Sequence, residues 1–128
     1  MSNGILIKYL KLYFCFIIIF FSIPAISLES KNKGIDYLIK GENEKAYNIL
    51  IKYAENGDSE SQNFIGMMYL YGDYVNSDPE IAKKWLLKSS NQNNGWAQFN
   101  LANIYINSLL GFRDLDLAIE YLNKSVSN

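Results

Sequence analysis

The sequence contains no histidine, one cysteine and two prolines among its 128 residues. Histidine is the commonest general base and the commonest metal ligand in proteins, so its absence removes the usual acid–base and metal-binding chemistries. The single cysteine, Cys15, cannot supply the ligand set of a zinc site. The glycines do not fall in the spacing of a phosphate-binding loop. These absences predict a protein that binds no metal and no cofactor and lacks the common catalytic groups.

Charge of either sign is also in short supply, since 12 basic and 13 acidic residues give a formal net charge of −1. Without a basic surplus to neutralise phosphates, the chain is not expected to bind nucleic acid. Two carboxylate pairs, Asp114 with Asp116 and Glu42 with Glu44, lie two residues apart, and such neighbours do not share a helix face. Acids accumulate in the first turns of helices, so both pairs are interpreted as solvated helix starts. A carboxylate-dependent envelope hydrolase is therefore only a remote alternative.

The N-terminus differs in composition from the rest of the chain. Two lysines precede an apolar run at residues 12–23, which Pro24 ends, and small residues follow at 25–27. This order predicts a secretory signal peptide over residues 1–27 that is cleaved after Ser27 and takes Cys15 with it. A membrane span needs about 20 apolar residues, so an uncleaved anchor, with the membrane touched only through this segment, is the alternative. We expect a bacterial protein exported through the inner membrane, periplasmic or secreted.

The remaining chain, residues 28–128, repeats itself at an offset of 36 residues. Internal repeats of this length are typical of solenoid folds. Upstream of Ala46, Gly34 and Tyr37 have the spacing of Gly66 and Tyr69, but with a linker that is four residues shorter. The matching pairs include Gln62 with Gln98, Tyr69 with Tyr105, Asp78 with Asp114, Ala82 with Ala118, and Leu86 with Leu122; Ala46 and Leu50 extend the series backwards.

Each unit is predicted to form two helices. In the middle unit Asp58 or Ser59 can cap the first helix, and Gly72 suits the left-handed position past its end. Asp78 followed by Pro79 is a strong start signal for the second helix. The predicted fold is all-α, a solenoid of about two and a half to three helix hairpins. The units cover about residues 30–57, 58–94 and 95–128.

These spacings resemble the Sel-1-like repeat family, which is related to the tetratricopeptide repeat. Serines at 61, 89 and 90 replace alanines of the family pattern, and Ser108 stands where a loop glycine is expected. The first unit, with Gly34, Tyr37 and Ala46, looks more like a plain tetratricopeptide unit. The pattern is carried by Ile65, Gly66, Tyr69, Gly72, Val75, Asp78, Ala82 and Trp85 in the middle unit, and by Ala97, Leu101, Ala102, Tyr105, Asp114, Ala118, Tyr121 and Ser125 in the third.

The resemblance implies helix pairs stacked in a right-handed superhelix that acts as a scaffold for binding other proteins. Exported bacterial members of such a family are associated with host interaction, envelope regulation and immunity against secreted effectors. For the motif residues themselves a structural role is predicted. Small residues such as Gly66 and Ala82 let helices approach, and large ones such as Tyr69 and Trp85 fill the adjoining space.

Binding residues are expected between the motif positions. In tetratricopeptide-like units the first helix lines the concave face, and methionine, aromatic and amide side chains suit contact with a protein or peptide. A helix rotation of one position would place the same apolar residues in the core instead. The candidate residues are Asn63, Met67, Leu70, Tyr71, Trp96, Phe99, Asn103 and Asn107.

Two further features point to interaction surfaces. Leu109, Leu110 and Phe112 cluster in a predicted loop, where apolar residues can mark a binding site, unless the loop packs into the end of the stack. The third unit is also followed by no polar capping helix, although solenoids usually need capped ends. We therefore expect this end either to tolerate exposure or to meet a partner, including a second copy in a homodimer.

The sequence thus predicts an exported, non-catalytic repeat protein that binds a protein or peptide through the concave face of the solenoid. The alternative is an immunity or inhibitor protein that neutralises a secreted effector toxin, suggested by small size, export and acidity. Gene neighbourhood and toxin sensitivity of a deletion strain would separate the two.

Overall fold

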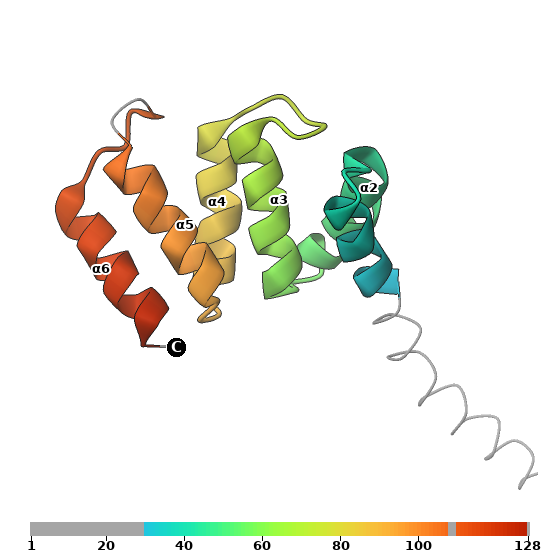
Figure 1. Ribbon diagram of the computed structural model, residues 1–128. Helices are drawn as coiled ribbons and strands as arrows, with labels where there is room; N and C mark the ends of the chain where they lie inside the picture. Colours follow the sequence, from blue (N-terminus) through green and yellow to red (C-terminus); the bar gives the residue numbers. More distant parts are fainter. Residues whose placement is uncertain (1–29, 108–109, 128) are drawn as a thin grey trace, which may run out of the picture.

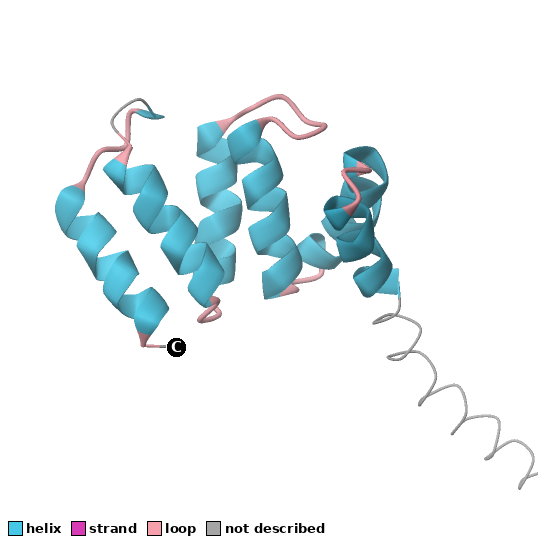
Figure 2. Cartoon of the chain, in the orientation of Figure 1, coloured by secondary structure: helices cyan, strands magenta, loops and turns pink. Residues whose placement is uncertain are grey.

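Figure 1 shows the computed structural model of the chain, which describes residues 30–107 and 110–127. The predicted signal peptide and Leu109 lie outside the described residues. Within them every regular element is helical, as Figure 2 shows, so the predicted all-α fold is confirmed. Residues 30–39 are helical, followed by α2 (Asn43–Glu55), α3 (Ser59–Tyr71), α4 (Pro79–Ser90), α5 (Gly95–Ile106) and α6 (Leu115–Val126).

The helices form hairpins that lie side by side along the molecule (Figure 1). α3 packs against α4 and α5 packs against α6, while the contacts of α2 with α3 and of α4 with α5 join one hairpin to the next. α3 also touches α5, so the first helices of successive hairpins share one side of the stack. Residues 40–42 connect the first hairpin, whereas longer loops at 72–78 and 107–114 connect the second and third.

Side-chain caps begin the helices at repeated positions. Oδ1 of Asp58, Asp78 and Asp114 each accepts a hydrogen bond from the backbone N–H three residues later, at 2.8–3.0 Å. Asn94 caps α5 in the same way, so Asp58 and Asn94 are equivalent at the offset of 36. These bonds satisfy backbone donors that no helical carbonyl can reach. Asp58, and not Ser59, is the cap of α3. Gly72 ends this helix with φ 77°.

Glycine allows the two helices of a hairpin to approach closely. A Cβ atom on Gly66 would lie 2.8 Å from Cγ of Leu86, and one on Gly34 would lie 3.0 Å from Cγ of Leu50. Both distances are shorter than Cβ atoms in proteins normally show. Leu50 and Leu86 are 36 residues apart, and both side chains are fully buried. The repeated glycine–leucine contact therefore sets the helix spacing in the first two hairpins.

The apolar core follows the stack as two clusters within the described residues. The first is centred on Leu50, Ile65 and Met68, and Tyr37, Tyr69 and Trp85 pack against it. The second contains Leu86, Ala97, Leu101 and Ile104. Tyr105 and Tyr121 border the second cluster with their rings stacked at 5.8 Å. The small residues of the repeat are all buried, namely Ala46, Ala82, Ala102 and Ala118.

Two amide side chains, of which Gln62 is buried, join successive hairpins. Nε2 of Gln62 donates to the Ala54 carbonyl at 3.0 Å, and Nε2 of Gln92 donates to Oε1 of Gln62 at 2.8 Å. Gln92 also reaches the Gly57 carbonyl at 2.9 Å. Gln62 thereby links α2 to the turn after α4, and its buried amide is satisfied as buried polar groups must be.

A tyrosine pair gives this fold a testable signature at high pH. The Tyr47 and Tyr69 hydroxyls lie 3.1 Å apart. Burial, together with this hydrogen bond, raises the pKa of Tyr47 to about 12. In the unfolded chain tyrosines ionise near pH 10, whereas Tyr47 of the folded chain keeps its proton up to about pH 12. The contribution of protonated Tyr47 to the stability of the fold is therefore fully present below about pH 10. This stabilisation is lost as the pH rises from about 10 to about 12.

Ultraviolet titration of tyrosinate is therefore expected to show one phenol that ionises near pH 12 and disappears in Tyr47→Phe. The matched control is Tyr71→Phe, because the Tyr71 side chain is 64% exposed. Loss of the late phenol in Y71F, or its persistence in Y47F, would contradict the assignment.

Candidate protein-binding groove

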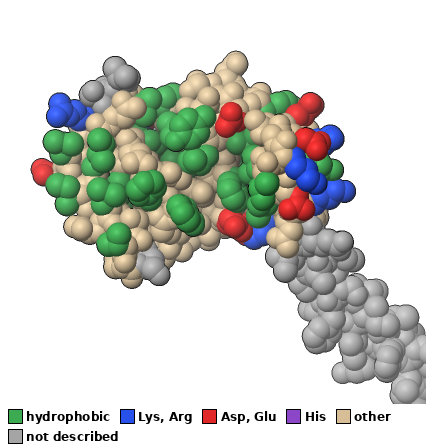
Figure 3. Space-filling view, viewed as in Figure 1, with side chains coloured by type: hydrophobic (Ala, Val, Ile, Leu, Met, Phe, Trp, Pro, Cys, Tyr) green, Lys and Arg blue, Asp and Glu red, His purple; other side chains and the backbone are tan. Residues whose placement is uncertain are grey.

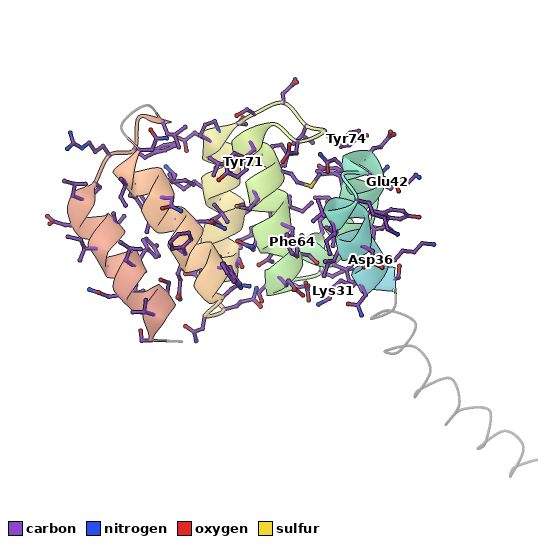
Figure 4. The ribbon with its side chains drawn as sticks, viewed as in Figure 1. Lys31, Asp36, Glu42, Phe64, Tyr71 and Tyr74 are labelled. Carbon is purple, nitrogen blue, oxygen red and sulfur yellow. The ribbon has the colours of Figure 1, made fainter. Side chains whose placement is uncertain are left out.

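A groove of about 460 Å³ runs between α3 and α5 on the side where these helices meet, and we call it the α3–α5 groove. Figure 3 shows hydrophobic and polar side chains next to one another on this face of the molecule. In Figure 4, Tyr71 lies at the upper end of α3 and Phe64 lies lower on the same helix. The lining residues are Glu60, Asn63, Phe64, Met67 and Tyr71 from α3, and Asn94, Trp96, Phe99, Asn100 and Asn103 from α5 and its cap.

Helical periodicity explains why these residues share a face. In α3, residues 60, 63 or 64, 67 and 71 follow one another at three or four positions, and residues 96, 99 or 100, and 103 do the same in α5. The opposite face of each helix carries the core residues, such as Ile65 and Leu101. Packing of the core face on the neighbouring helices therefore fixes which side chains reach the groove.

Aromatic side chains stand exposed at the groove. Trp96 is 74% exposed, Tyr71 64% and Phe99 43%. Large apolar side chains exposed together are uncommon on a soluble surface and mark sites where another molecule is bound. Trp96 and Phe99 also border a second hollow of about 410 Å³ next to Ser125, so they stand between the two.

A pair of amides forms the polar part of the groove. Nδ2 of Asn100 donates to Oδ1 of Asn63 at 2.9 Å, and both residues are more than nine-tenths buried. Each amide carries both a donor and an acceptor, and the pair uses one of each. The groove thus offers an amide N–H of Asn63 and an amide oxygen of Asn100, a combination that matches a peptide unit.

Among the described residues that line the groove, Glu60 is the one with a charged side chain. Its Oε2 lies 3.1 Å from Nζ of Lys31. Lys31 also lies 3.2 Å from Oδ2 of Asp58. Burial opposes the charge on Lys31, but Glu60 and Asp58 outweigh it and raise the pKa of the ammonium group. For Asp58 burial is likewise outweighed, by hydrogen bonds from Ser61 and Lys31, which lower the pKa of its carboxyl group.

The structure gathers six of the candidate residues in this groove and adds four more. The sequence does not predict that Glu60 and Asn94 line the groove. Glu60 is explained as an acid in the first turn of α3, and Asn94 as the cap of α5. Phe64 and Asn100 also line the groove. The predicted residues that line the groove are Asn63, Met67, Tyr71, Trp96, Phe99 and Asn103.

The other candidates lie elsewhere. Leu70, Leu110 and Phe112 pack against the core cluster around Leu86. Leu70 does so from α3, whereas Leu110 and Phe112 do so from the segment between α5 and α6. Nζ of Lys83 lies 3.6 Å from the centroid of the Phe112 ring, which covers the ring further. Asn107 ends α5, with its backbone N–H bonded to the Asn103 carbonyl at 3.1 Å, and does not line the groove.

Two searches of the described residues bear on other kinds of site. No group of three or more histidine, cysteine, aspartate or glutamate side chains there is arranged to hold a metal ion. None of the helices in the same residues has the length and apolar character needed to cross a membrane.

Comparison with known proteins agrees with the hairpin stack. The chain is similar to a crystal structure of a Sel1 repeat protein from Oxalobacter formigenes, with a TM-score of 0.69 and 28% identity over 74% of this chain and 39% of that one. It is 40% identical to a Sel1-like repeat-containing protein of Acanthamoeba polyphaga mimivirus over 66% of its own length. An F-box protein of Arabidopsis thaliana is 36% identical over 59% of the chain.

The chain spans only 15% of the viral protein and 21% of the plant protein. The Sel1 repeat family model matches residues 59–94 and 97–128, which make up more than half of the sequence. These matches confirm the predicted α-solenoid and the resemblance that the repeat pattern indicated. The protein belongs to the Sel1 repeat family.

Proposed function

We propose that the protein is a non-catalytic binding module that holds a segment of a partner protein in the α3–α5 groove. Sel1 repeat proteins generally mediate protein–protein interaction. One observation supports the proposal most directly. Exposed aromatic side chains, such as Trp96 and Phe99, line the same groove as the hydrogen-bonded amides of Asn63 and Asn100. Aromatic side chains contribute most of the binding energy at many protein interfaces.

The chemistry of the groove defines the partner segment. Trp96, Phe99 and Met67 fit apolar side chains, while the amide pair fits a backbone peptide unit. Glu60 is already paired with Lys31, so a charged side chain has no strong counter-charge in the groove. The proposed ligand is a short uncharged segment with apolar anchors.

We further propose that the protein acts outside the inner membrane. The order of lysines, apolar run, Pro24 and small residues supports export. Mass spectrometry of the protein recovered from the periplasm or medium is expected to show Leu28 as its first residue. Recovery only of the full-length chain in the membrane fraction would favour the uncleaved anchor.

Introducing a charged side chain into the groove is expected to weaken peptide binding. Peptides selected from a random display library on the full chain should be apolar and uncharged, and their binding should change the fluorescence of Trp96. Phe99→Glu should raise their dissociation constant by at least about 10-fold, because a buried charge without a partner opposes binding. The control is Ile39→Glu, which adds the same charge at the other end of the stack, where the Ile39 side chain is 80% exposed.

Unchanged melting temperatures would show that both variants are folded. Equal affinities of F99E and the parent chain would refute the groove assignment, as would equal losses in F99E and I39E.

A further inference from the structure

An apolar stripe runs along α6. Leu115 is 49% exposed, Ile119 56% and Val126 84%, and Leu122 between them is half-buried. The four residues follow one another at intervals of four, three and four, so they share one helix face. Figure 3 shows hydrophobic side chains at the edge of the molecule where Figure 1 places α6. We call these residues the α6 stripe.

The repeat shows what this face does in the other hairpins. Ile119 is equivalent, at the offset of 36, to Lys83 and Tyr47. Tyr47 packs its ring 5.4 Å from the ring of Tyr74, and Lys83 lies 3.6 Å from the Phe112 ring. Both contacts reach the loop of the following hairpin. The position of Ile119 is thus one that faces the next unit.

Two more positions of the stripe behave in the same way. Leu50 and Leu86, the equivalents of Leu122, are fully buried beneath the next hairpin. Ala54 and Ser90 are 1% and 6% exposed, whereas their equivalent Val126 is 84% exposed. Within residues 30–107 and 110–127 nothing covers this face of α6. Among the described residues, this face of α6 repeats the inter-hairpin contact surface of α2 and α4 without a hairpin packed on it.

At the other end of the stack, two charged residues stand where the middle hairpin has buried apolar ones. Gly34 of the first hairpin corresponds to Gly66 of the second. Lys33, one residue before Gly34, therefore corresponds to Ile65, and Asp36, two residues after it, corresponds to Met68. Ile65 and Met68 are buried against the preceding helix, whereas Lys33 and Asp36 are exposed. Stacking the α6 stripe of one copy on this end of another would bury two charges without designed partners, which is costly. Head-to-tail extension of the stack is therefore disfavoured.

We propose that the α6 stripe is the two-fold interface of a homodimer. The four-three-four spacing reads the same in both directions, so two antiparallel copies of α6 match residue for residue. Leu115 of one copy then meets Val126 of the second copy, and Ile119 meets Leu122. A two-fold axis uses the same patch on both subunits, which a self-complementary stripe requires. Antiparallel helices also oppose their dipoles favourably.

The dimer is weak and concentration-dependent. One helix per subunit buries less area than the 1,200 Å² or so at the low end of stable specific interfaces. A dissociation constant of about 10–100 µM is expected, so the chain is a monomer when dilute and a dimer when concentrated.

Cross-linking tests the arrangement itself. In a Cys15→Ser background, the full-length variants Leu115→Cys and Val126→Cys are oxidised alone and mixed. The antiparallel two-fold predicts disulfide dimers in the mixture, because residue 115 of one copy meets residue 126 of the other, and little dimer in either variant alone. Dimers of V126C alone would overturn the antiparallel pairing, and absence of dimers in all samples would overturn the interface.

Sedimentation equilibrium of the protein recovered from cells measures the dissociation constant of the dimer. Val126→Glu should raise the dimer dissociation constant by at least about 10-fold. The matched control is Ile39→Glu at the other end of the stack, where the side chain is 80% exposed, and it should leave the constant unchanged. Equal dissociation constants for V126E and the parent chain, or a monomer at every concentration, would refute the proposal. Phe99→Glu should still dimerise, so a failure in the groove and a failure at α6 are distinguishable.

Discussion

Replacing Leu86 by alanine is expected to lower the free energy of unfolding by about 3–5 kcal/mol. The Leu86 side chain is fully buried and connects the helices of the middle hairpin to α5 through Gly66, Ala97 and Leu101. Removing three carbon atoms there loses the transfer free energy and leaves a cavity that the surrounding helices cannot close. The total stability of such a domain is about 5–15 kcal/mol, so L86A would be close to unfolding at moderate temperature.

Urea denaturation monitored by circular dichroism measures this change, and the repeat supplies its control. Leu122 stands at the equivalent position in the third hairpin but is only half-buried. Measured at a concentration where the chain is monomeric, Leu122→Ala is expected to cost about 1 kcal/mol, since less surface is returned to water. If L86A, like L122A, lowered the free energy of unfolding by only about 1 kcal/mol, the second core cluster would not depend on Leu86.

Most of the fold could be predicted because its signals are local. Asp78 before Pro79, Asp114 at the equivalent position and Gly72 define helix ends through hydrogen bonds to their own neighbours. The offset of 36 then fixes which helices are equivalent. Gly66 pointed to a close helix contact, but the identity of its neighbour, Leu86, is a tertiary fact that only the structure supplies.

The candidate site could be predicted only in part, because it depends on how far each helix is rotated in the stack. Counting from Gly66 placed Met67 and Tyr71 towards the groove, where the structure also has them. The same count placed Leu70 there, but the adjoining hairpin draws that side chain into the core. Phe112 shows the same limit for loops: the sequence could not decide whether it is exposed, and its contact with Lys83 comes from a distant helix.

The glycine at position 66 is expected to show strong energetic coupling to Leu86. In Gly66→Ala the new Cβ would lie 2.8 Å from Cγ of Leu86 and 3.3 Å from the Ala82 carbonyl oxygen. Over-packing of this kind costs about 1–3 kcal/mol, which outweighs the roughly 1 kcal/mol by which alanine favours a helix over glycine. The third hairpin supports this reasoning, since Ala102 is accommodated where its partner position, Leu122, is only half-buried.

A double-mutant cycle separates the close contact from the other effects of each change. In the Leu86→Ala background the clashing side chain is gone, so adding Gly66→Ala is expected to be neutral or stabilising, with a coupling energy of about 1–3 kcal/mol. Gly95→Ala is the control, because its Cβ would meet only the Ser125 carbonyl oxygen, at 3.4 Å, and should cost little in either background. Additive effects of G66A and L86A would mean that the glycine is not there to admit the leucine. The repeated glycine–leucine contact would then have to be explained by helix ends and loops rather than by packing.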